Sequence, residues 1–167
     1  MRQQWPVIMV AALALALAGC AEAETSEMHL TSSAFGDGDP IPADHTCDGA
    51  DTSPPLAWID VPDGAAAFAL LVTDPDAGGF VHWVLADIPA EVRELPAGEG
   101  DTLGVPGANG FGDTGWGGPC PPSGEHRYEF RLYALSERVG LAEPTADDVR
   151  ARTALGVAEL VGVYARR

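Results

Sequence analysis

The clearest pattern in the chain is an apolar run followed by stretches in which apolar and polar residues alternate. Residues 66–73 form a short, continuous apolar run, which is typical of a strand buried on both faces. In residues 80–88 every second position falls on the same face. His82 is therefore expected to share an inward face with Val84, opposite Trp83. Both segments are predicted to be β-strands.

A third stretch, residues 126–135, alternates more regularly. Its charged side chains, which include Arg127 and Arg131, all fall on one face. This face must meet solvent, because isolated charges are costly to bury. The opposite face, which begins with His126 and Tyr128, is therefore predicted to point inward.

The C-terminal part carries helix signals. Thr145-Ala-Asp-Asp148 resembles a capping box with Asp in place of Glu. Apolar residues then recur at helical spacing at Val157, Leu160, Val161 and Tyr164. Long loops, residues 36–57 and 95–125, hold many of the 20 glycines and 14 prolines. We predict one mainly β domain, an antiparallel β-sandwich with one or two short C-terminal helices.

An apolar segment near the N-terminus predicts export. Arg2 precedes an apolar run over residues 7–18, which would span roughly 18 Å as a helix, too short for a bilayer core of about 30 Å. The run ends in Leu17-Ala-Gly-Cys20, which matches the lipobox of bacterial lipoproteins. An ordinary secretory cleavage, with Cys20 unmodified, is the alternative.

These features predict three segments. Residues 1–19 are expected to be a lipoprotein signal peptide, and residues 20–28 the lipidated Cys20 with a flexible tether. Residues 29–167 are expected to form the folded domain. The protein would then be exported and anchored in the cell envelope, with the membrane as a partner through the lipid.

Cysteine usage and net charge refine this prediction. If Cys20 carries lipid, Cys47 and Cys120 remain, and an even remainder in an oxidising compartment favours a disulfide over two separate buried thiols. The formal net charge is −16, and all nine cationic residues counted as Lys or Arg are Arg. Such an acidic chain would repel phosphate backbones, which argues against nucleic-acid binding.

Three polar residues stand at the ends of the predicted strands. Asp74 ends the apolar run, and His82 and His126 lie at the inward starts of the other two strands. A glycine- and proline-rich loop, residues 118–124, leads into His126. Cationic imidazoles beside backbone N–H groups that glycine leaves open would form an anion site. Either histidine could instead be an ordinary core residue.

Other kinds of chemistry fit less well. Two histidines and an aspartate could hold a metal ion, but no further ligand spacing supports one, and we predict neither metal nor cofactor. A hydrolase would use His82 and His126 as acid and base, with Asp74 orienting one of them. No serine lies in a nucleophile motif, so we predict that the chain is not an enzyme.

The same residues resemble a known family. Residues 74–77 and 81–89 resemble the first conserved block of the phosphatidylethanolamine-binding proteins, also called Raf-kinase-inhibitor-like proteins. The stretches that resemble the second block, the N-terminal motif of the bacterial branch and the family's C-terminal end are residues 118–135, 46–58 and 159–164. The likeness covers roughly residues 30–166, nearly all of the predicted domain.

The resemblance implies a β-sandwich with a small pocket for phosphate or a phosphate-like head group. Carried over by residue, that pocket consists of Asp74, His82, Gly118, His126 and Tyr128. Three residues depart from the family pattern: Gly78 replaces a proline, which predicts a looser loop, and His45 and Trp116 replace tyrosines near the expected mouth.

We therefore expect an envelope-anchored protein that binds a small anion or a phospholipid head group and catalyses no reaction. It would act through this binding or by inhibiting a partner protein. The hydrolase is the alternative. A protein-interaction module with a vestigial pocket is a second alternative.

Overall fold

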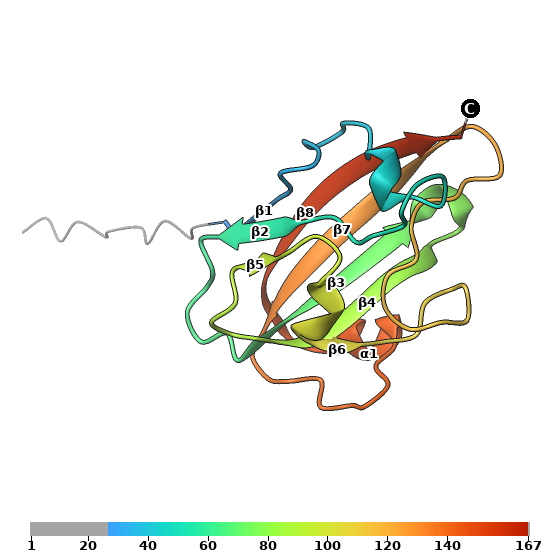
Figure 1. Ribbon diagram of the computed structural model, residues 1–167. Helices are drawn as coiled ribbons and strands as arrows, with labels where there is room; N and C mark the ends of the chain where they lie inside the picture. The colour runs from blue at the N-terminus through green and yellow to red at the C-terminus, as the bar shows by residue number, and fades with distance from the viewer. Residues whose placement is uncertain (1–26, 167) are drawn as a thin grey trace, which may run out of the picture.

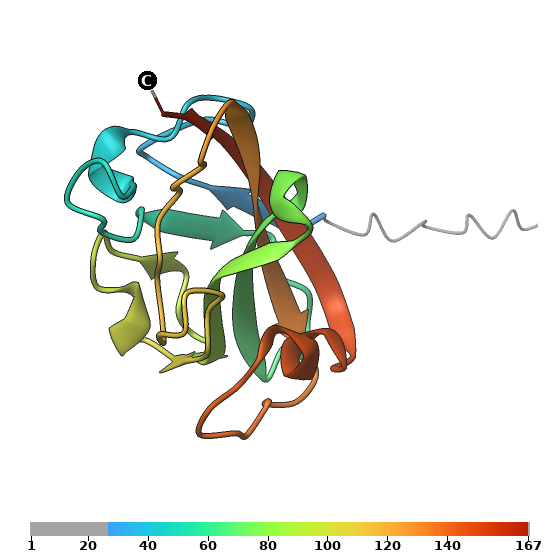
Figure 2. The same ribbon diagram turned by 90° about the vertical axis from the view of Figure 1, so that its right-hand side faces the viewer.

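The chain folds into two antiparallel β-sheets, as predicted. The computed structural model describes residues 27–166 (Figure 1). The larger sheet has five strands in the order β6-β4-β3-β7-β8, with bounds Val105–Pro106, Phe80–Pro89, Ala67–Asp74, Glu125–Leu135 and Ala154–Ala165. The smaller sheet has the order β1-β2-β5, with bounds His29–Thr31, Leu56–Ile59 and Glu94–Leu95. Figure 2 shows β1 and β2 lying over one face of the larger sheet.

Both faces of the larger sheet are covered. Between the sheets, Leu30 and Trp58 pack with Phe68 and other apolar residues of the larger sheet in the main core. On the opposite face, Val149 of helix α1 (Ala146–Arg150) packs in a second cluster with Leu71. Every residue of β3 is buried, which confirms the strand predicted from the apolar run.

A bulge in β4 corrects the predicted face of one histidine. On β3, two successive residues pair with Trp83 and Val81, so that His82 between them is an extra residue. A bulge of this kind re-aims a side chain relative to strict alternation. His82 consequently packs against Tyr128 of the main core, whereas Val84 lies in the opposite cluster. The prediction that His82 and Val84 share a face is therefore wrong. The prediction that His82 points inward agrees with its burial.

One C-terminal helix is confirmed. The Thr145 hydroxyl accepts a hydrogen bond from the Asp148 N–H (3.3 Å), and the Asp148 carboxylate accepts one from the Thr145 N–H (2.9 Å). This reciprocal pair is the predicted capping box, and it precedes α1.

The prediction of a second helix over residues 157–164 is wrong. These residues belong to β8, which pairs with β7 along its length. Ala158 and Leu160 are buried and alternate with the exposed Val157 and Glu159, a period of two that the helical spacing masked. Valine favours strands and glycine disfavours helices, so local preference agrees with the strand.

In the part of the chain that the structure describes, three short 3-10 turns connect strands: η1 (Ala43–His45), η2 (Pro75–Ala77) and η3 (Gly100–Thr102). The predicted signal peptide and Cys20 lie outside the described residues, and Met28, at the end of the predicted tether, is buried in the main core. Within residues 27–166 no helix is long and apolar enough to cross a membrane.

Candidate functional site

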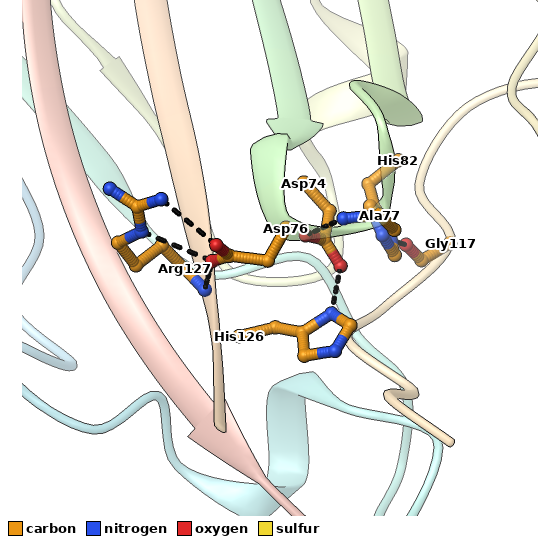
Figure 3. A network of polar contacts seen from close by, with 7 residues as sticks. All are labelled: Asp74, Asp76, Ala77, His82, Gly117, His126 and Arg127. Carbon is orange, nitrogen blue, oxygen red and sulfur yellow. Dashed lines mark hydrogen bonds and ion pairs between the residues drawn. The ribbon is translucent and has the colours of Figure 1, made fainter. Parts of the chain in front are cut away.

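Asp74 is held at the junction of β3 and η2. Its side chain is buried, with the residue 3% exposed. One carboxylate oxygen accepts a hydrogen bond from the Ala77 N–H (2.9 Å), which caps the turn. The other accepts from Nδ1 of His126 (2.7 Å; Figure 3). Asp74 therefore orients a histidine from β7 while its own position is fixed by the turn.

His126 and His82 each use Nδ1 for a hydrogen bond within the chain. Nδ1 of His82 donates to the carbonyl oxygen of Gly117 (2.7 Å), and Nδ1 of His126 donates to Asp74. A carbonyl or an ionised carboxylate can only accept, so each Nδ1 carries a proton. On both rings Nε2 is the nitrogen left for a ligand.

Burial lowers the pKa of His82 below its ordinary value. Removal from water disfavours the charged imidazole, and this outweighs the opposing effects of the Gly117 carbonyl, the Asp74 charge and the Gly118 backbone. His82 is only 3% exposed. The lowered pKa favours a neutral His82, whose Nε2 can then only accept a hydrogen bond.

Tyr128 supplies a hydroxyl without a partner. Its side chain is fully buried, and its Oη has no hydrogen-bond partner among the described residues. Burial raises the pKa of this phenol, and the charges of Asp74 and Asp76 act in the same direction. An unpaired buried hydroxyl is costly, which points to a ligand or water as its partner.

These groups line one small cavity of about 200 Å³. Four of the five pocket residues carried over from the resemblance, Asp74, His82, His126 and Tyr128, meet there. The remaining walls are mainly apolar and consist of Ala77, Phe80, Phe111, Cys120, Pro121 and Pro122. The last three belong to the loop that was expected beside the site.

Gly118 does not line this cavity. Its N–H donates to the Asp51 carboxylate (2.9 Å) and so is not open to a ligand, contrary to the expected role of this loop. A Cβ here would lie 2.1 Å from an Asp51 oxygen and 2.9 Å from the His45 carbonyl oxygen. The glycine allows close packing of two loops, and Gly118 instead lines a neighbouring cavity.

The predicted disulfide joins those same two loops. Cys47 and Cys120 are bonded, with their Cα atoms 5.5 Å apart. The Cys47 N–H also donates to the Pro119 carbonyl (3.2 Å). Because Cys120 lines the histidine cavity, the bridge fixes one wall of the site.

An ion pair that the sequence reasoning missed clamps η2 to β7. The Arg127 side chain donates twice to Asp76 (3.0 and 2.9 Å), and the Arg127 N–H donates once more (2.9 Å; Figure 3). These bonds lower the pKa of Asp76 to about 2. Since η2 follows Asp74 and Arg127 follows His126, the pair holds together the two segments that carry the Asp74–His126 contact.

The three departures from the family pattern lie around the site. Gly78 ends η2 with φ of 69°, a left-handed conformation that proline cannot adopt. His45 lies outside the cavity and its Nδ1 contacts the Thr52 carbonyl (2.9 Å). Trp116 lines the neighbouring cavity and contacts Trp83 edge to face.

The structure is a β-sandwich with a small cavity near the ends of its central strands, into which two histidines, an aspartate and a tyrosine bring polar groups. The chain belongs to the phosphatidylethanolamine-binding protein family, whose model matches residues 31–165. Among its relatives, the UPF0098 protein of Aquifex aeolicus is 43% identical over 155 residues, covering 83% of this chain and 89% of that protein. The UPF0098 protein of Methanothermobacter thermautotrophicus is 44% identical over 151 residues, covering 83% and 99%.

Solved structures of the family share the fold. A phosphatidylethanolamine-binding protein homolog from Chlamydia trachomatis is 35% identical, with a TM-score of 0.78 over 85% of this chain and 99% of that one. YbcL of E. coli, described as a member of the mammalian family, is 33% identical, with a TM-score of 0.77 over 84% and 99%.

Proposed function

We propose that this chain is an envelope-anchored binding protein whose histidine cavity takes a small anion, such as phosphate or a phospholipid head group. The observation that carries the proposal is that three polar groups of one cavity make no hydrogen bond to another residue within residues 27–166. Nε2 of His82, Nε2 of His126 and the Tyr128 hydroxyl all belong to residues that line it. Family membership supports the same class of ligand.

The size and walls of the cavity limit the ligand. Its volume of about 200 Å³ is below the range of about 300–1,000 Å³ that is common for drug-sized ligands. Phe80, Phe111 and two prolines supply an apolar surround. These walls suit a head group or a small ester better than a whole lipid.

The chemistry of the donors makes anion binding depend on protons. Tyr128 can donate its hydroxyl hydrogen directly. The neutral His82 cannot donate from Nε2, so an anion that bonds to this atom must either bring its own proton or bind together with one. Titration calorimetry of the purified full chain with sodium sulfate tests the proposal, and heat that saturates at one anion per chain is the expected result. No saturable binding at pH 5.5 would contradict it.

We further propose binding without turnover. The cavity walls that the structure describes contain no serine or threonine, and their one cysteine is in the disulfide. The Asp74–His126 pair has the geometry of a base and its orienting group, which is the one observation in favour of a hydrolase. Release of phosphate from a panel of phosphoesters, lost in His126→Ala, would favour the enzyme.

The membrane anchor gives a separate prediction. Replacing Cys20 with Ser removes the thiol that the lipobox predicts as the site of lipid attachment. The variant is expected either to leave the membrane fraction or to accumulate as an uncleaved precursor, as measured by fractionation and immunoblotting. A matched Cys47→Ser/Cys120→Ser variant should remain in the membrane fraction. A mature-sized Cys20→Ser protein that still fractionates with membranes would refute the anchor.

A further inference from the structure

Phe111 stands between the histidine cavity and a second cavity. The second cavity has a volume of about 250 Å³. Its walls include Asp51, Asp113 and Trp116. Phe111 and Cys120 are the two lining residues that both cavities share. Cys120 is held by the disulfide. Phe111 is therefore the shared residue that can be replaced by a smaller one without breaking a covalent bond.

The Phe111 ring packs directly on the site. Its centroid lies 4.8 Å from that of Phe80 and 5.4 Å from that of His82, both edge to face. The residue is nevertheless 50% exposed. One side of the ring therefore shields His82 while the other side meets solvent.

The backbone beneath Phe111 is built to hold it there. The Asn109 side chain accepts from the Phe111 N–H (3.0 Å) and the Asp113 N–H (3.1 Å), and donates to the Gly115 carbonyl (3.1 Å). A Cβ at Gly117 would lie 2.6 Å from the Phe111 ring, so that glycine leaves room for it. The hydrogen bonds of this loop therefore position the ring, and Phe111 belongs to neither apolar cluster.

We propose that Phe111 is the specificity-determining residue of the anion cavity: its ring closes the wall toward the second cavity, restricts the ligand to small anions and shields His82 from water. The inference rests on the proposed anion-binding function. The acidic side chains Asp51 and Asp113 beyond the wall add to the restriction, because a larger anion extending that way would meet negative charge.

Ligand selectivity tests the wall. In Phe111→Ala the two cavities join, and the phenyl group of phenyl phosphate can fill the space of the missing ring. The expected result is a rise of about tenfold or more in the ratio of phenyl phosphate to sulfate affinity, measured by calorimetry at pH 5.5. Phe111→Leu, which keeps more of the wall, should give a smaller rise. Leu141→Ala removes another exposed apolar side chain (41%) and should leave the ratio unchanged.

A second measurement does not need a bound ligand. The groups that face His82 are Asp74 from β3, His126 and Tyr128 from β7, and Asp51 from the disulfide loop. None of these changes in Phe111→Ala, so NMR titration of the His82 imidazole reports the loss of shielding alone. The pKa of His82 is expected to rise toward its ordinary value in Phe111→Ala and to stay in place in Leu141→Ala.

The outcomes separate the two proposals. If the wild type binds no sulfate, the proposed function fails, while the His82 titration still tests the shielding by Phe111. If the wild type binds sulfate but Phe111→Ala leaves both the affinity ratio and the pKa of His82 unchanged, the role of Phe111 is refuted. Should the alanine variant not fold, Phe111→Leu must show both shifts in the same direction, or the inference is overturned.

Discussion

Replacing Cys47 and Cys120 together with serine is expected to lower the free energy of unfolding by up to about 4.4 kcal/mol. The disulfide joins residues 73 positions apart. The chain-entropy model attributes most of the effect to the larger freedom of the unfolded chain when the bridge is absent. Urea denaturation of the wild type and the double variant measures this difference in free energy from the two midpoints, provided that the slope m is the same for both proteins.

Reductant provides the control for this prediction. Dithiothreitol should move the urea midpoint of the wild type toward that of the serine variant and should leave the variant itself unaffected. The bridge also fixes a wall of the histidine cavity through Cys120, so sulfate affinity should fall along with stability. A wild-type midpoint that does not respond to dithiothreitol under denaturing conditions would show that the bond adds no stability.

The sequence predicted the fold best where strands are long and buried. β3 and β7 carry a clear apolar run and a clear alternation, and both are in the structure. β1 and β2 have three and four residues, too few for a periodic pattern to stand out. β8 was mistaken for a helix because apolar residues from both faces of the strand, Val157, Leu160, Val161 and Tyr164, also fit helical spacing over a short window.

The bulge at His82 shows a different limit. Alternation along one strand gives the faces correctly only if the register with its neighbour is continuous. The extra residue in β4 is visible only once β3 is paired with it. Sequence reasoning therefore predicted a buried histidine and still assigned it the wrong neighbours.

The candidate site also contains residues that the sequence predicts and residues that it does not. Asp74, His82, His126 and Tyr128 lie at strand ends, where pattern and resemblance both apply, and the structure brings them together. The role of Gly118 depends on Asp51, which lies 67 residues away, and no local signal reveals that contact. Phe111 lies in a glycine-rich loop without periodicity, so only the folded loop shows that it reaches the cavity.

Sulfate is expected to bind the wild type about tenfold or more tightly at pH 5.5 than at pH 8, because a proton on Nε2 of His82 lets the charged ring donate to the anion. Burial lowers the pKa of His82 in the empty site, and a bound anion raises it by favouring the charged ring. Affinity is therefore highest below the pKa of the empty site and falls as pH rises through the pKa of the complex. Sulfate keeps a constant charge over this range, whereas phosphate has its own ionisation near pH 6.

The same pKa shift predicts how pH affects stability. The folded-state pKa of His82 lies below its unfolded value, which is near 6.5 for an ordinary imidazole. The unfolded chain then binds more protons, so the contribution of the neutral ring is present above about pH 6.5 and is lost as pH falls through the folded pKa. Sulfate should oppose this loss, and its effect on the melting temperature should be larger at pH 5.5 than at pH 8.

Histidine variants decide whether this mechanism holds. His82→Ala should reduce the pH dependence of sulfate binding. His126→Ala removes a donor held by Asp74 and should weaken binding at pH 5.5 by about tenfold or more, the loss of roughly 1.5–3 kcal/mol from one charge-assisted hydrogen bond. His29→Ala, on the exposed surface of β1, is the matched control and should bind like the wild type. Equal affinity at both pH values, unchanged in His82→Ala and His126→Ala, would mean that the two histidines are core residues and that the anion site lies elsewhere.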